Sequence, residues 1–320
     1  MLRPLLRFFA PHRWTLFHVE PPPLEHLSAC PICAGASLLP AIEVVDHSVS
    51  RERFHLMDCA CCGFRFTNPR PAASELGRYY HSEDYISHTN TSLTLRDRLY
   101  QRARSWALSR KYRLLRRYEP HGRVLDMGCG TGEFLAHLKS RGYLVQGVEP
   151  STKAREQAIA NHSLDVVPGL DAVTHSERFR VITLWHVLEH LPDPRATLKK
   201  LYALLADKGL LVIAVPDRGS WDARHYGPDW AAWDVPRHLS HFRQQDLRAL
   251  LQDHGFEIVR IKRMGLDAPY VSMLSEGYRG RGAGAALVMG ALVGMQSNLV
   301  ALVTGRPMSS SLYIARKAEA

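Results

Sequence analysis

The sequence predicts an α/β fold in which helices cover both faces of a parallel sheet. From Arg123 onward, short apolar runs alternate with stretches of helical periodicity, and this alternation is typical of parallel sheets. A turn with three glycines follows the first apolar run, where it would let the backbone come close to a ligand. Two close pairs of cysteines near the N-terminus predict a small metal-stabilised module beside the sheet.

Length and charge limit what the chain can be. With 320 residues and 46% hydrophobic residues, it can bury one substantial core and still form a smaller domain. The net charge of +10 favours an anionic partner such as a nucleotide-linked substrate, a nucleic acid or an acidic membrane. The N-terminal apolar stretch is broken by Arg7, Pro11 and His12, so we expect no secretion signal and a cytoplasmic location.

Three regions follow from the pattern along the chain. Residues 1–72 read as a small cysteine-containing module, and residues 73–120 as a helical linker or lid. Within the linker we expect a basic amphipathic helix over 92–118, with Leu99, Ala103 and Trp106 on one side. The segment 96–117 of this helix supplies +8 of the net charge. Residues 121–320 form the main domain.

The main domain is expected to contain seven strands. Strands are predicted over 124–127, 144–149, 164–167, 181–185, 210–215, 257–262 and 311–316. Helices are predicted over 133–141, 153–161, 195–206 and 244–254, and the third should turn Leu198, Leu201, Leu204 and Leu205 inward.

An apolar segment over 284–303 lies within an expected insertion at 266–308. Gln296, Ser297 and Asn298 interrupt it after twelve apolar residues, where a membrane span needs about 20. We therefore expect no membrane span. The segment is predicted to be core or a homodimer interface, with a lipid-facing surface and peripheral membrane contact as the alternative.

The glycine turn, VLDMGCGTG over 124–132, is the main candidate for ligand binding. Gly128, Gly130 and Gly132 let the backbone approach a ligand, and a helix N-terminus offers unpaired amide donors. The spacing G-x-G-x-G differs from the dinucleotide fingerprint. Asp126 would repel a pyrophosphate but suits a ligand with a cationic amino-acid part, such as S-adenosylmethionine. The alternative is a tight turn without a ligand.

Two more acids follow later strands. Glu149 lies 23 residues after Asp126 at the end of the second strand, where it could accept hydrogen bonds from both ribose hydroxyls. A solvated acid at a strand end is the alternative. Asp171, after the third strand, is a candidate for the adenine amino group, although a surface acid explains it nearly as well.

The segments VLDMGCGTGEFL, GVEPS and FRVITLWHVLEHLPDP resemble the successive motifs of class I S-adenosylmethionine-dependent methyltransferases. The resemblance covers roughly residues 123–262. It implies a Rossmann-like seven-stranded sheet with an antiparallel last strand, and S-adenosyl-L-methionine as the cofactor. It also implies that Trp185 and His186 line the cofactor pocket at the end of the fourth strand, together with the positions Asp126, Gly128, Gly130 and Glu149.

The cysteine pairs Cys30/Cys33 and Cys59/Cys62 form two C-x2-C knuckles, which can close a tetrahedral structural zinc site. Ordinary buried cysteines are the alternative. With GFRFTNPRP and the tyrosines at 79, 80 and 85, the knuckles resemble the N-terminal zinc modules of bacterial methyltransferases of sugar and polysaccharide pathways. We expect no further large C-terminal domain of the kind found in their sugar C-methylating members. A hydroxyl of a sugar, glycolipid or related metabolite is therefore the expected acceptor.

The loop over 221–242 is the expected acceptor site, because it holds three tryptophans and three histidines beyond the carboxyl ends of the strands. His238 and His241 could take a proton from a hydroxyl, or could hold the loop in place by hydrogen bonds. His190 is expected to be structural.

Two other functions compete with this interpretation. The zinc module and the basic helix could hold RNA, although the fourth strand ends without the [DN]-P-P-[FY] tetrad used for exocyclic base amines. A cofactor-binding scaffold without catalysis is the non-enzymatic alternative. The basic helix could line an acceptor cleft or could form a solvated face.

Overall fold

A computed structural model describes residues 23–80, 95–173 and 178–318, with side chains from 105 onward in the second range. Tyr85 and the expected helix start at Ser92 lie outside these ranges, as do the side chains of Leu99 and Ala103.

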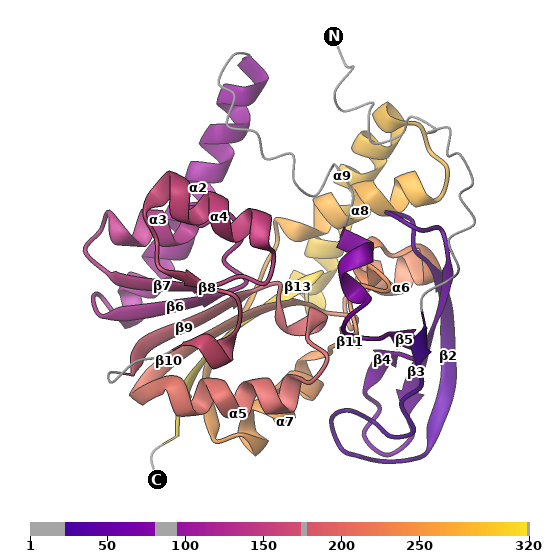
Figure 1. Cartoon of the computed structure of the whole chain (residues 1–320). Helices are drawn as coiled ribbons and strands as arrows, with labels where there is room; N and C mark the ends of the chain where they lie inside the picture. Colours follow the sequence, from indigo (N-terminus) through magenta and orange to yellow (C-terminus); the bar gives the residue numbers. More distant parts are fainter. Residues whose placement is uncertain (1–22, 81–94, 174–177, 319–320) are drawn as a thin grey trace.

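The central sheet has seven strands in the order β12-β13-β10-β9-β6-β7-β8 (Figure 1). Strands β6 to β10 pair in parallel, and β13 runs antiparallel to both β10 and β12. The predicted seven-stranded sheet with an antiparallel last strand is therefore confirmed. The strands are β6 (Arg123–Met127), β7 (Leu144–Val148), β8 (Val166–Val167), β9 (Phe179–Trp185), β10 (Leu205–Pro216), β12 (Phe256–Arg263) and β13 (Ser310–Lys317).

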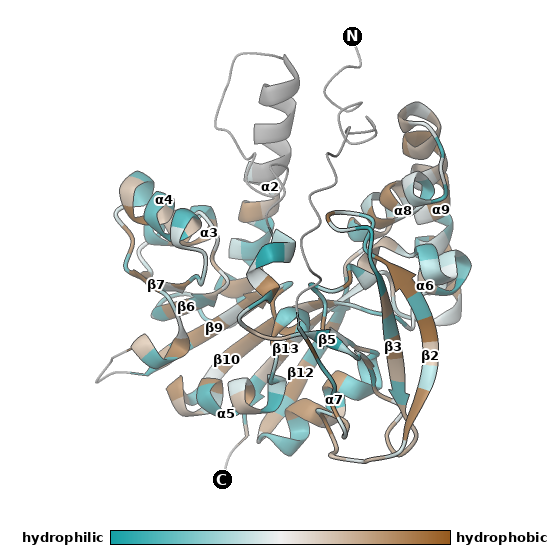
Figure 2. Cartoon of the chain, turned by 45° about the vertical axis from the view of Figure 1, so that its right-hand side comes forward, coloured by the Kyte–Doolittle hydropathy of each residue, from teal (hydrophilic) through white to brown (hydrophobic). Residues whose placement is uncertain are grey.

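Helices cover both faces of this sheet. Figure 1 shows α2, α3 and α4 on one side, and α5 and α7 on the other. Hydrophobic residues predominate along β9 and β10 between the two layers (Figure 2). The bounds are α2 (Leu95–Tyr118), α3 (Glu133–Lys139), α4 (Thr152–His162), α5 (Pro194–Leu204) and α7 (Gln244–Asp253).

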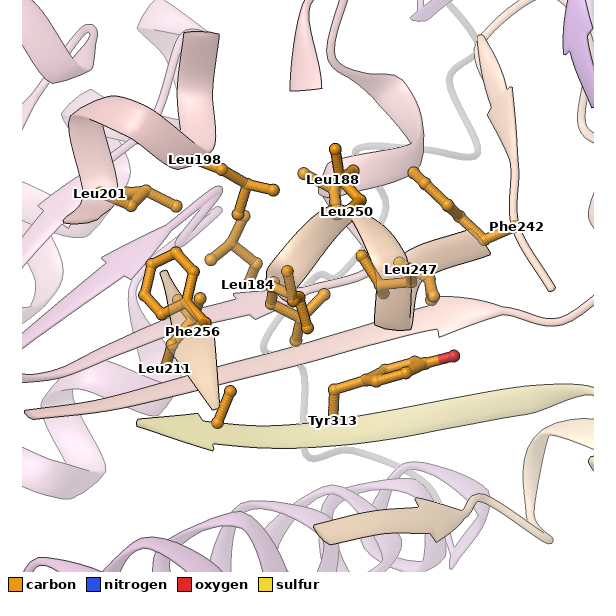
Figure 3. Packing of buried hydrophobic residues seen from close by; sticks show 14 of the residues in the cluster. Leu184, Leu188, Leu198, Leu201, Leu211, Phe242, Leu247, Leu250, Phe256 and Tyr313 are labelled. Carbon is orange, nitrogen blue, oxygen red and sulfur yellow. The ribbon is translucent and has the colours of Figure 1, made fainter. Parts of the chain in front are cut away.

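The largest core cluster lies between the sheet and α5 and α7 (Figure 3). Leu198 and Leu201 of α5 are fully buried, as the helical spacing predicted. The expectation that the helix continues through Leu205 is wrong. Leu205 has extended backbone and begins β10, where it pairs with Phe179. Leu205 is buried as the first residue of strand β10 and not as part of the helix. The helix therefore ends earlier than its periodicity suggested.

The basic helix α2 packs through a different face from the one expected. Trp106 is 47% exposed, and the guanidinium of Arg110 lies over its ring at 5.3 Å. The buried side is formed by Leu115, which is fully buried, with Leu108 and Tyr112 beside it. The positions 108, 112 and 115 also have helical spacing.

The N-terminal cysteine module shares its sheet with the main domain. Strand β11 (Ser240–His241) pairs with β4 (Arg65–Thr67) and completes an antiparallel sheet with β3 (Arg53–Cys59) and β2 (Leu38–Val45). A separate ribbon joins β1 (Leu24–Glu25) to β5 (Arg70–Pro71). Phe64 and Phe66 belong to the same core cluster as Leu188 and Phe242. The described residues 23–72 therefore share a core with the main domain.

Helices α8 (Asp267–Tyr278) and α9 (Ala283–Thr304) occupy the expected insertion between β12 and β13. Helix α9 runs continuously through residues 296–298, where polar residues interrupt the apolar segment. Ser297 donates a hydrogen bond to Asp222 at 2.7 Å, and Asn298 donates one to the Gly265 carbonyl at 2.7 Å. These polar side chains find partners inside the protein, so they do not end the helix.

The outer face of α9 is apolar and exposed. By length and composition α9 could cross a membrane, although 33% of its most apolar window is buried inside the protein. The expectations of a homodimer and of peripheral membrane contact concern this face, and both stay predictions. The exposed side chains are Leu287, Val288, Leu292, Met295, Leu299, Leu302 and Val303.

Candidate functional site

The glycine turn lies at the carboxyl end of β6 and is held against the neighbouring strand. The backbone amides of Gly128 and Cys129 donate to the Val148 carbonyl at 2.7 and 3.1 Å. Gly128 has φ +70°, and a Cβ there would come within 2.5 Å of Val187. Gly130 also has a positive φ but faces open space. The turn is therefore tight on one side and accessible at Gly130.

Asp126 is buried directly beneath this turn, with 3% of its surface exposed. Burial raises the pKa of its carboxyl to about 6, although the Thr183 hydrogen bond and the charge of Lys111 oppose the rise. Thr183 Oγ1 donates to Asp126 Oδ1 at 2.5 Å. At neutral pH the result is a buried negative charge at the place where a cationic ligand group was expected.

Glu149 joins the turn from the end of β7. Its Oε2 accepts a hydrogen bond from the Gly130 amide, and its Oε1 accepts one from the Ser151 amide, both at 2.9 Å. These two bonds fix the carboxylate beside the accessible glycine, and each oxygen keeps a lone pair for a ligand hydroxyl. The structure thus brings Asp126, the glycines and Glu149 together as predicted.

Two other predicted residues are explained by their structural surroundings. A Cβ on Gly132 would come within 2.5 Å of Leu164 and 2.9 Å of Ala158, so packing of α3 against α4 requires this glycine. The Asp171 side chain is 87% exposed and forms an ion pair with Lys200 at 2.6 Å. This geometry favours the surface-acid interpretation of Asp171.

Trp185 and His186 lie at the end of β9 with partners that the sequence did not reveal. Lys111 of α2 lies over the Trp185 ring at 4.3 Å. His186 lies 3.3 Å from Glu189 Oε1 and 3.5 Å from Asp267 Oδ2. Burial opposes a charge on His186, but the hydrogen bonds with both acids raise its pKa to about 10.

Lys111 and Asp267 are site residues that sequence reasoning missed. Lys111 looked like one member of a basic helix, yet burial lowers its pKa while the charge of Asp126 opposes that shift. Asp267 begins α8 after a long separation from β9 in the chain. Only its tertiary position beside His186 identifies it.

His238 and His241 have different surroundings. His241 belongs to β11, where its Nε2 lies 3.1 Å from Thr67 Oγ1, and burial lowers its pKa well below the usual value. His238 Nδ1 donates to the Ala232 carbonyl at 2.9 Å. Its ring packs edge-on against His190, with centroids 4.5 Å apart. His241 therefore joins the main domain to the N-terminal sheet, whereas His238 faces His190 and Glu189.

The four predicted metal ligands gather in the N-terminal module. The sulfurs of Cys30 and Cys62 are 3.7 Å apart, and those of Cys33 and Cys59 are 3.5 Å apart. A tetrahedral zinc with Zn–S bonds of about 2.3 Å separates its sulfurs by roughly 3.8 Å. The quartet Cys30, Cys33, Cys59 and Cys62 thus fits zinc, and it does not include Cys61.

Comparison with known proteins agrees with this geometry. A family profile described as "Methyltransferase domain" matches residues 98–261. The chain is 31% identical over 108 residues to the ubiquinone biosynthesis O-methyltransferase of Glaesserella parasuis, covering 30% of this chain and 46% of that protein. It is 26% identical over 154 residues to the enzyme of the same name from Rhodopseudomonas palustris, covering 45% and 61%. The chain thus spans about half the length of these relatives.

A solved methyltransferase structure shares the fold. It is the magnesium protoporphyrin IX methyltransferase (ChlM) from Synechocystis PCC 6803 with bound SAH, at a TM-score of 0.51 and 14% identity. The similarity covers 77% of this chain and 100% of that one. The family match covers just over half of the chain, and the sheet order agrees with it. The chain therefore belongs to the methyltransferase domain family and has the class I S-adenosylmethionine-dependent methyltransferase fold.

Proposed function

We propose that the protein transfers the methyl group of S-adenosyl-L-methionine to a hydroxyl of a small molecule, such as a sugar, a glycolipid or a related metabolite. The convergence of Asp126 and Glu149 around the accessible Gly130 is the observation that carries this proposal. Asp126 would attract the cationic amino-acid part of the cofactor, and Glu149 would accept hydrogen bonds from its ribose.

The acceptor would bind beside the loop over 221–242. In methyl transfer the acceptor oxygen attacks the methyl carbon while the carbon–sulfur bond breaks, so alignment supplies much of the rate. Of the two candidate bases, His238 has the better geometry. Its Nδ1 donates to a carbonyl, so its Nε2 keeps a lone pair that could take the acceptor proton. His241 is held against Thr67.

We further propose that the quartet Cys30, Cys33, Cys59 and Cys62 binds zinc. Four thiolates leave the ion no open position, so its role would be folding and not catalysis. Cysteines that bind a metal must stay reduced and not form disulfides. Reducing compartments favour this state, which supports the expected cytoplasmic location.

Calorimetry with S-adenosylmethionine tests the cofactor site. We expect the wild-type protein to release heat on binding, and Asp126→Ala to lose most of its affinity because it loses the charge beneath the turn. The matched control is Asp171→Ala, which removes an exposed acid paired with Lys200 and should bind normally. The absence of binding by the zinc-loaded wild-type protein would refute the proposal.

Transfer of a labelled methyl group tests the acceptor class. We expect label to appear in sugar nucleotides or glycolipids, and not in bulk RNA. Label in RNA, together with salt-sensitive RNA binding, would instead support the RNA alternative.

A further inference from the structure

Three side chains that could bind a metal converge near the end of β9. Glu189 and His190 come from the turn Leu188–His190, and His238 comes from the loop before β11. One ligand atom from each residue lies within 4.8 Å of the others. This trio is separate from the cysteine quartet and contains a different set of donors.

Hydrogen bonds orient both imidazoles for metal binding. His190 Nδ1 lies 3.0 Å from the Arg237 carbonyl and 2.9 Å from the Tyr80 hydroxyl. His238 Nδ1 lies 2.9 Å from the Ala232 carbonyl. A carbonyl only accepts, so each Nδ1 carries the proton and each Nε2 keeps its lone pair. Histidine ligands of metals are commonly held in this way by a backbone carbonyl.

Glu189 supplies a buried carboxylate that is only half used. The residue is 1% exposed, and its Oε1 lies 3.3 Å from His186 Nδ1. Its Oε2 is buried and has no hydrogen-bond partner among the described residues. A buried carboxylate oxygen without a partner is costly, so a cation at this oxygen would stabilise the arrangement.

The surrounding charges also favour a divalent cation. Glu189 and Asp267 lie on either side of the His186 ring, at 3.3 and 3.5 Å from its nitrogens. Asp234, which lies 3.8 Å from His238 Nε2, shares Arg237 with Asp46. Four carboxylates thus lie in and around the trio, a setting that favours a bound cation.

We propose that Glu189, His190 and His238 bind a divalent transition-metal ion, with Zn²⁺ or Co²⁺ as the best match to two imidazoles and one carboxylate. Three protein ligands leave a coordination position open, and this position would take the acceptor oxygen and stabilise its deprotonated form. His238 then acts as a metal ligand, and the hydroxyl proton leaves to solvent. This inference rests on the proposed function, because it assigns the metal to the acceptor side of that site.

Cobalt uptake tests the trio without relying on activity. Metal-free protein is equilibrated with Co²⁺, and the bound metal is counted by elemental analysis while the visible spectrum is recorded. We expect about two Co²⁺ per chain, one with intense thiolate bands from the cysteine quartet and one with weak bands from nitrogen and oxygen ligands. His238→Ala and Glu189→Gln should lose the weak component and keep the thiolate bands, which also reports that they fold.

The matched control is His225→Ala, which removes an exposed histidine of the same loop and should still take up two ions. One Co²⁺ per wild-type chain with full thiolate bands would overturn the inference, as would two ions in both trio variants. Calorimetry with S-adenosylmethionine on the same wild-type sample separates the two proposals. Normal cofactor binding with a single Co²⁺ refutes the metal trio alone, whereas absent cofactor binding refutes the proposed function.

Discussion

Asp126 combines two properties that oppose each other in water. It is almost completely buried, and yet its proposed role in cofactor binding requires a negative charge. Burial raises the pKa to about 6, so the carboxyl is ionised at neutral pH but close to its titration range. The Thr183 hydrogen bond favours the charged form and keeps the pKa from rising further.

Cofactor binding should therefore depend on pH. As the pH falls below about 6, Asp126 takes up a proton and loses its attraction for a cation, so we expect the affinity for S-adenosylmethionine to fall. Thr183→Val should move the midpoint to higher pH, because it removes a hydrogen bond to the charged form. Calorimetry across pH 5–8 measures both midpoints. Thr304→Val on the exposed end of α9 is the control, and equal midpoints in all three proteins would contradict the prediction.

The raised pKa of Asp126 affects the stability of the fold in the opposite direction. The folded pKa of Asp126 lies above its ordinary value of 3.8, so between these values the folded state binds more protons than the unfolded one. The contribution of Asp126 to the free energy of unfolding therefore increases as the pH falls from about 6 towards 4. Weaker cofactor binding between pH 6 and pH 4 would therefore reflect the protonation of Asp126, because this protonation does not itself destabilise the fold.

At the scale of elements, small residues determine how α9 packs against α8. A Cβ on Gly290 would lie 2.3 Å from the Met273 backbone, and one on Gly294 would lie 2.4 Å from the Pro269 backbone. These glycines let the two helices approach closely, while the large apolar side chains of α9 point outward. For this reason α9 lacks the usual pattern of a surface helix, in which large apolar residues face inward and polar residues face outward.

Replacing each of two glycines of α9 with alanine should have opposite effects on the free energy of unfolding. Gly290→Ala should lower the free energy of unfolding by about 1–3 kcal/mol, because backbone atoms must move apart. Gly284→Ala, at an open position of the same helix, should raise it by up to about 1 kcal/mol through helix propensity. Urea unfolding monitored by circular dichroism measures both changes. Equal effects at the two positions would show that α8 and α9 are not closely packed.

At the scale of the whole molecule, the cysteine module is joined to the methyltransferase sheet by hydrogen bonds as well as by core packing. Arg218 and Arg243 both donate to the Gly63 carbonyl, at 2.6 and 2.9 Å. Thr67 donates to the His238 carbonyl at 2.8 Å. The cysteine module therefore helps to position the loop that contains His238.

Loss of zinc should destabilise the entire chain. A structural zinc contributes on the order of 10 kcal/mol to small modules, so Cys59→Ser should lower Tm in a single transition. It should also weaken cofactor binding if the loop moves. Cys61→Ser is the matched control, because Cys61 lies beside the quartet without belonging to it. Two separate unfolding transitions, one unaffected by the Cys59 substitution, would show that the module is independent.

Local signals were enough for much of the fold and part of the site. Alternating apolar runs predicted the strands, because buried parallel strands need continuous hydrophobic sequence. The Asp126 turn and the cysteine knuckles were readable because each depends on residues close together in the chain. Local signals did not predict the end of α5 at Leu204 or the continuous helix α9, because partners distant in the sequence decide both.

The sequence by itself determined the class of fold, the methyl-donor site proposed around Asp126 and Glu149, and the four cysteines proposed to bind a structural metal. Only the tertiary structure separated His238 from His241, placed Lys111 and Asp267 beside the site, and brought Glu189 to His190 and His238. The reason is physical. Turns and knuckles are formed by neighbours in the chain, whereas the charge, tautomer and burial of a side chain depend on atoms that folding brings from elsewhere.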